Sequence, residues 1–65
     1  MVVASLAERK LIGVRILECE ARMIDQRQEI ALMERAGRDV SSAINVLSAM
    51  EGGQKLRLRR LAALA

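Results

Sequence analysis

Hydrophobic residues recur at helical spacing through the first half of the chain. Steps of four and three residues connect one row: Ile12, Ile16, Cys19, Met23, Gln26, Ile30 and Met33. This alternation is typical of a coiled-coil seam. The segment has no proline and a single interior glycine, Gly13. We therefore expect one long helix over about residues 3–36.

A second row of apolar residues follows the same predicted helix. Its members are Val14, Leu17, Ala21, Ile24 and Ala31. We interpret this row as lying beside the first, so that the apolar stripe is wider than a single partner helix covers. The sequence therefore predicts a self-association seam made of these five residues.

The helical pattern breaks at residues 37–39, which read Gly-Arg-Asp. Glycine adopts the left-handed conformation that ends a helix without steric cost, and Arg35 suits the negative end of the helix dipole. Asp39 can cap a second helix by accepting a hydrogen bond from the main-chain amide of Ser41 or Ser42. A turn this short makes the two helices antiparallel neighbours.

A second helix is predicted over about residues 40–64. Its seam again follows steps of three and four: Val40, Ala43, Leu47, Met50, Gln54, Arg57, Leu61 and Leu64. The pair Gly52-Gly53 lies inside it, and each glycine costs about 1 kcal/mol relative to alanine in a helix interior. We expect a continuous helix, straight or bent, with a loop and a third helix as the alternative.

The turn also fixes an expected register for the hairpin. About ten residues at the start of the first helix then overhang the end of the second. The expected neighbours are Met33 and Ala43, Ile30 with Val46 and Leu47, Gln26 and Met50, and Glu20 and Arg57.

Composition supports this all-α, single-domain antiparallel hairpin over residues 1–65. Aromatic residues and proline are absent, and good helix formers dominate. A chain of 65 residues needs disulfides, a metal or oligomerisation to become stable, but it has one cysteine and no histidine. Oligomerisation remains, so we predict a homodimer in the form of a four-helix bundle.

The segment Glu20–Leu56 carries a longer pattern across both predicted helices. Its matching positions are Glu20, Met23, Gln26, Arg27, Ile30, Met33, Glu34, Arg35, Gly37, Asp39, Ala43, Val46, Leu47, Met50 and Glu51. This pattern resembles a set of small uncharacterised bacterial helical-hairpin coiled-coil proteins. The chain departs from them with Val40 at a usual threonine, Met50 at a usual phenylalanine, and Gly52-Gly53 where they stay helical. The resemblance implies the hairpin fold and no assigned activity.

The candidate catalytic chemistry is sparse. Cys19 is the one candidate nucleophile, but the chain has no histidine to act as its base. We interpret Cys19 as a small seam residue, with a catalytic thiol and an intersubunit disulfide as alternatives. The acidic residues lack the Glu-x-x-His spacing of bundle metal sites and are interpreted as salt-bridge partners of arginines. We expect no enzyme activity, metal or cofactor.

Methionine contributes to both predicted seams, at Met23, Met33 and Met50. Its flexible side chain fills irregular gaps in a core. We interpret all three as core residues, with an adaptable groove for helical targets as the alternative.

The net charge of +3 comes from the C-terminal segment, where Lys55, Arg57, Arg59 and Arg60 occur without an acid. In the favoured interpretation the Arg57 guanidinium reaches Glu20, while Arg59 and Arg60 are solvated or contact a partner. The alternative is nucleic-acid binding through these four residues, joined by Arg9 and Lys10. A membrane-surface helix is disfavoured, because Arg57 falls in the middle of the apolar face.

The location and function follow from the same features. The longest uncharged stretch, Val40–Met50, is too short to span a bilayer, and the start MVVASLAERK does not have the form of a secretory signal. We therefore expect a cytoplasmic protein. The predicted function is non-enzymatic, as an oligomerisation or protein–protein interaction module, with nucleic-acid binding as the alternative.

Overall fold

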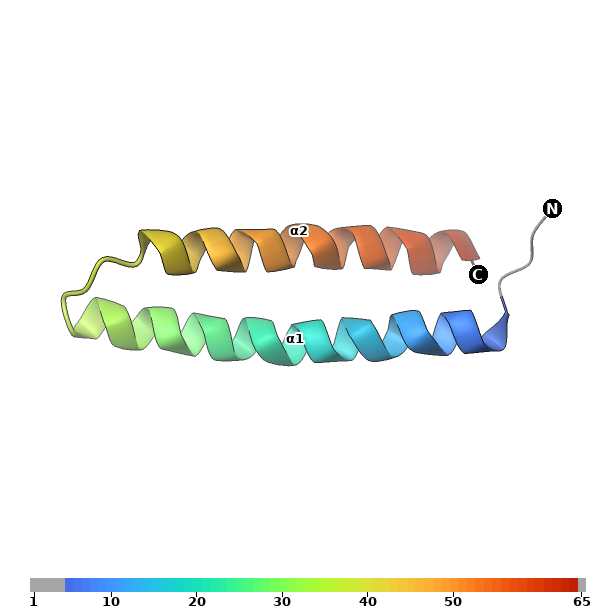
Figure 1. Ribbon diagram of the computed structural model, residues 1–65, viewed down its shortest axis with the longest axis horizontal. Coiled ribbons are helices and arrows are strands. Elements are labelled where there is room, and N and C mark those ends of the chain that lie inside the picture. Colours follow the sequence, from blue (N-terminus) through green and yellow to red (C-terminus); the bar gives the residue numbers. More distant parts are fainter. Residues whose placement is uncertain (1–4, 65) are drawn as a thin grey trace.

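A computed structural model describes residues 5–64, which form two α-helices packed side by side as an antiparallel hairpin (Figure 1). Helix α1 spans Leu6–Arg35 and helix α2 spans Ser41–Leu64. The hairpin is a rod with Cα extents of 53 × 15 × 12 Å. The predicted all-α hairpin is confirmed.

Helix α1 has a side-chain cap at its start and a glycine stop at its end. The Ser5 hydroxyl accepts a hydrogen bond from the Glu8 amide at 3.1 Å, which satisfies one of the free donors of the first turn. At the other end, Gly37 has a φ of 70°. The Gly37 amide donates to the Glu34 carbonyl at 3.0 Å, and the following amide donates to the Met33 carbonyl at 2.9 Å. This pair of bonds is a Schellman motif, which needs the left-handed residue predicted at position 37.

Asp39 starts helix α2, as the sequence predicts. Its carboxylate Oδ1 accepts from the Ser41 amide at 2.9 Å and from the Ser41 hydroxyl at 2.7 Å. These two hydrogen bonds, the main-chain one first, hold the pKa of Asp39 below its ordinary value. The helix itself begins at Ser41, one residue later than expected, with the Val40 carbonyl accepting from the Ile44 amide at 2.9 Å.

The core is a single seam between the helices, and it consists of the residues predicted for the seam of each helix. All seven positions of the first predicted seam are buried or half-buried, and so are all eight of the second, of which Val40 directly precedes α2. Among the described residues, only Gly13 and Gly53 share that status outside these rows. The seam is thin, because no described side chain is fully enclosed.

Helix α2 continues through Gly52-Gly53 without a break (Figure 1). The expected continuity is therefore confirmed, and the alternative of a loop and a third helix is wrong. The cost of the two glycines is met by the neighbouring helix, since Gln54, directly after the pair, is the most enclosed residue of α2, at 4% exposed.

The register of the hairpin differs from the expected one. The Gln26 side chain donates to the Ala43 carbonyl at 3.0 Å, whereas Met50 was its expected neighbour. The Met50 carbonyl lies instead 3.7 Å from the Cys19 sulfur. The connection between the helices covers residues 36–40, and α2 begins alongside α1, some way back from the tip of the hairpin (Figure 1). The sequence prediction had assumed a turn of three residues that reversed the chain at the tip.

The shifted register removes the expected N-terminal overhang. In Figure 1 the start of α1 and the end of α2 lie at nearly the same level. Arg15 and Arg57 line one hollow, and from there each helix runs a similar length to its end. The expected contact between Glu20 and Arg57 is also replaced, since the Glu20 carboxylate accepts from the Gln54 amide at 3.1 Å.

Candidate functional site

The predicted self-association row lies on the exposed surface of α1. Val14 is 49% exposed, Leu17 71% and Ile24 51%. Ala21 and Ala31 are exposed as well. The row is therefore available for contact with another molecule.

The sequence interpretation set this whole row beside the seam, and helix geometry divides the row into two parts. An α-helix turns by about 100° per residue, so a residue two positions after a seam residue lies about 200° around the helix. Val14 follows Ile12 by two positions, and Ala21 follows Cys19 in the same way. Leu17, Ile24 and Ala31 each follow a seam residue by one position, or about 100°. The row therefore extends from one flank of α1 to the face turned away from α2, and all of it lies outside the seam.

The four C-terminal cations do not form one patch. At helical spacing, Lys55 and Arg59 share the outer face of α2, while Arg60 lies on its flank. All three are exposed, whereas Arg57 is half-buried on the seam. The four cations are close together in the sequence, but they lie on three different sides of α2.

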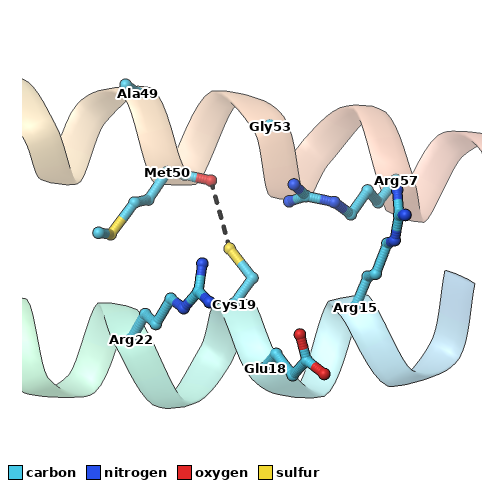
Figure 2. A pocket seen from close by; sticks show the side chains of 8 residues that line it. All are labelled: Arg15, Glu18, Cys19, Arg22, Ala49, Met50, Gly53 and Arg57. Carbon is cyan, nitrogen blue, oxygen red and sulfur yellow. Dashed lines mark hydrogen bonds between the residues drawn. The ribbon is translucent and has the colours of Figure 1, made fainter.

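Arg57 joins two arginines of the other helix around a hollow of about 300 Å³ (Figure 2). Arg15 and Arg22 are seven residues apart, so they lie on the same flank of α1. Figure 2 shows Arg22 beside the Cys19 thiol, Arg57 running back along α2 toward Gly53, and Arg15 rising toward Arg57. The remaining lining residues are Glu18, Ala49, Met50 and Gly53.

The hollow exists because α2 presents little side-chain volume beside it. Gly53 has no side chain, and Arg57, one turn later, folds back over it. A Cβ built at Gly53 would lie 3.4 Å from the Arg57 Nη1 atom. Gly53 therefore provides the surface on which this guanidinium rests, in addition to being part of the helix.

Sequence reasoning missed this cluster for a definable reason. The spacing of Arg15 and Arg22 on one flank was visible, as was the glycine four residues before Arg57. The expected register, however, set Glu20 opposite Arg57. With that pairing assumed, the three cations could not be brought together.

Cys19 sits at the inner wall of the hollow as a seam residue. It is 8% exposed, and its thiol donates to the Met50 carbonyl at 3.7 Å. The sulfur points toward α2 and away from the outer face of α1 (Figure 2), on which the self-association row lies. This geometry disfavours the intersubunit disulfide. The three seam methionines are likewise buried or half-buried, in keeping with core packing.

Metal binding and membrane insertion find no support in the described part of the chain. Within residues 5–64, no three acidic or cysteine side chains gather in a way that could hold a metal ion. Neither α1 nor α2, as described, combines the length and the apolar character needed to cross a bilayer.

Comparison with known protein families, curated proteins and solved structures gave no match to this sequence. The resemblance to bacterial helical-hairpin proteins therefore stays a prediction.

Proposed function

We propose that this chain is a non-enzymatic self-association module that forms a homodimer through the outer face of α1. The observation that supports it is the exposed row of Val14, Leu17, Ala21, Ile24 and Ala31, which lies outside the seam that α2 covers. Exposed apolar rows of this kind mark interaction surfaces in soluble proteins. The thin seam adds support, since a small scaffold without disulfide or metal needs association to become stable.

The size of the row indicates a dimer of modest affinity. Burying the exposed part of the Val14, Leu17 and Ile24 side chains contributes about 1–2 kcal/mol for each residue, or roughly 6–12 kcal/mol over two chains. Association costs about 4–15 kcal/mol in lost translational and rotational freedom. Leu11 and Leu32, which are also exposed on the edge of this face, supply the further apolar area that a stable dimer needs. We therefore expect dissociation at low protein concentration.

The proposed dimer is a layer and not a square bundle. If the outer faces of two α1 helices meet, each α2 lies on the far side of its own α1. The four helices then stand in the order α2, α1, α1, α2, joined by coiled-coil contacts at each step. This arrangement replaces the compact four-helix bundle expected from sequence.

Mass in solution tests the proposal. Light scattering after size exclusion, with detection by refractive index because the chain has no aromatic residue, should give twice the 7.2 kDa chain mass. Ile24→Glu should return a monomer, because it places a charge in the middle of the row. Asn45→Glu is the matched control, since it adds the same charge to an exposed position of α2 and should leave the mass unchanged. A monomer at all concentrations would refute the proposed dimer.

We further propose a reducing cytoplasmic location, which suits a chain whose single cysteine is a buried free thiol. Nucleic-acid binding is the second candidate function. It is supported by Lys55, Arg59 and Arg60, which are exposed in a segment without an acidic residue. A gel-shift assay with duplex and single-stranded DNA at about 50 mM salt tests this candidate, and no shift would exclude it.

A further inference from the structure

We infer that the hollow between Arg15, Arg22 and Arg57 is a binding site for a phosphate group. The three guanidiniums come from two helices and line one space of about 300 Å³. Such a volume is at the lower end of the range for small-molecule pockets, about 300–1,000 Å³, so the ligand that it accepts is small.

The charges on the lining residues favour an anion with two negative charges. Three guanidiniums and the one carboxylate of Glu18 leave an excess of two positive charges. Like charges that share a small space repel one another, and a bound anion removes that repulsion. A phosphate dianion matches the excess and offers oxygen acceptors in several directions.

The guanidiniums have their donors free for such a ligand. None of the side-chain hydrogen bonds that the described residues form uses an arginine. The salt bridge predicted for Arg57 is absent from them, because Glu20 is engaged with Gln54. Arginine presents five donors in a planar fork that matches phosphate oxygens, so free arginines at one spot are suited to phosphate.

Gly53 makes the space accessible from the α2 side. A larger side chain at this position would compete with the Arg57 guanidinium for the same volume, since the built Cβ already lies 3.4 Å from Nη1. The glycine thus leaves both the guanidinium and an approaching anion room beside the helix backbone.

The site is independent of the proposed dimer. Arg15 and Arg22 lie on a flank of α1, between the seam and the outer row, and Arg57 faces the seam. A second copy bound to the outer row leaves this flank open. The phosphate site can therefore exist whether or not the chain dimerises.

Inorganic phosphate is the probe for the test. It should be titrated into isotope-labelled protein at pH 7.5 in a phosphate-free buffer, with ionic strength held constant by chloride. The expected result is a saturable shift of the Gly53 amide and of the Nε–H signals of the three arginines. The variant Arg22→Gln should weaken binding by about fivefold, which is the loss of one charge-assisted contact at a partly exposed site. Arg59→Gln, on the outer face of α2, is the control and should change nothing.

Two outcomes would overturn the inference. One is a shift that rises linearly with phosphate, without saturation. The other is an equal response in Arg22→Gln and Arg59→Gln, which would mean that general positive charge is responsible. Arg22 is chosen because it is exposed and makes no hydrogen bond among the described residues, so its loss leaves the fold intact.

A second arm distinguishes the source of the phosphate. A short single-stranded oligonucleotide is titrated under the same conditions. If Arg22→Gln weakens both ligands, the site accepts the phosphodiester of a nucleic-acid backbone. If it weakens inorganic phosphate alone, the site accepts a small phosphorylated molecule. Both results support the site, and the first also supports the second candidate function.

Discussion

The side-chain amide of Gln54 donates a hydrogen bond to the main-chain carbonyl of Ile16 at 2.9 Å, across 38 positions of sequence. The same nitrogen donates to the Glu20 carboxylate at 3.1 Å. Gln26 makes the reverse connection, from α1 to the Ala43 carbonyl of α2. Two glutamines on one seam thus tie the helices together in a particular register, as buried polar residues do in coiled coils.

Gln54→Leu should stabilise the hairpin by about 1 kcal/mol. The Gln54 side chain is 4% exposed, and its Oε1 atom is buried without a hydrogen-bond partner. An apolar side chain of similar size removes that cost, whereas Gln54→Ala adds a cavity and should destabilise by about 1–2 kcal/mol. Urea unfolding followed by circular dichroism, at one protein concentration for all variants, measures the change in stability of both variants. A leucine variant less stable than the alanine variant would contradict this prediction.

Replacing glycines should have opposite effects at two positions. Gly52 lies in the interior of α2 with open space around it, so Gly52→Ala should raise the free energy of unfolding by about 1 kcal/mol. Gly37 has a φ of 70°, which L-residues adopt at a cost. Gly37→Ala should therefore lower the free energy of unfolding by about 1–2 kcal/mol. The pair serves as its own control, because the chemical change is identical. An unchanged or raised free energy of unfolding in Gly37→Ala would show that the turn does not need the left-handed residue.

The cap at Asp39 should make stability depend on pH. Its pKa is lowered from the ordinary 3.8 by the two hydrogen bonds from Ser41. The stabilisation is therefore present above the pKa of the unfolded chain and is lost as pH falls through the lower pKa of the folded chain. We expect the urea midpoint of the wild type to fall more between pH 5 and pH 2 than that of Asp39→Asn, which retains a neutral cap. Parallel curves for the two proteins would contradict a role for the charge.

Cys19 should react slowly with thiol reagents in the folded protein. Its side chain is 8% exposed and points to α2. Reaction then requires local opening, and we expect a rate about a hundredfold below that of the urea-unfolded chain. The double variant Cys19→Ser, Ser48→Cys places the thiol on the exposed surface and should react at the unfolded rate. Fast labelling of the wild type would show that the seam opens readily.

The seam could be predicted from sequence because it depends on local periodicity. Residues such as Met23 and Leu61 fall on one face of their helix wherever the partner sits, so the spacing alone identifies them. The cap at Asp39 and the stop at Gly37 were predictable for the same reason, since their bonds span a few residues.

The register depends on contacts that spacing does not encode. It is fixed by the path of residues 36–40 and by bonds between distant residues, such as Gln54 and Ile16. An antiparallel pair can slide by a whole heptad and keep every apolar residue on the seam. The arginine hollow was missed as a consequence of the register. The position of Val14 and Ala21 is different, because their offset of about 200° from the seam could be read from the spacing alone.

The double glycine at residues 52–53 also has a consequence for motion. Each glycine costs about 1 kcal/mol of helix stability relative to alanine, so this turn of α2 is held mainly by α1 and should open more often than the turns on either side. Amide hydrogen exchange should then be fastest in the middle of α2 as well as at its ends. Since Arg57 folds over Gly53 at this point, an anion held there would connect this turn of α2 to Arg15 and Arg22 of α1. Slower amide exchange at Gly53 in the presence of phosphate would show that the bound anion holds the two helices together at this turn.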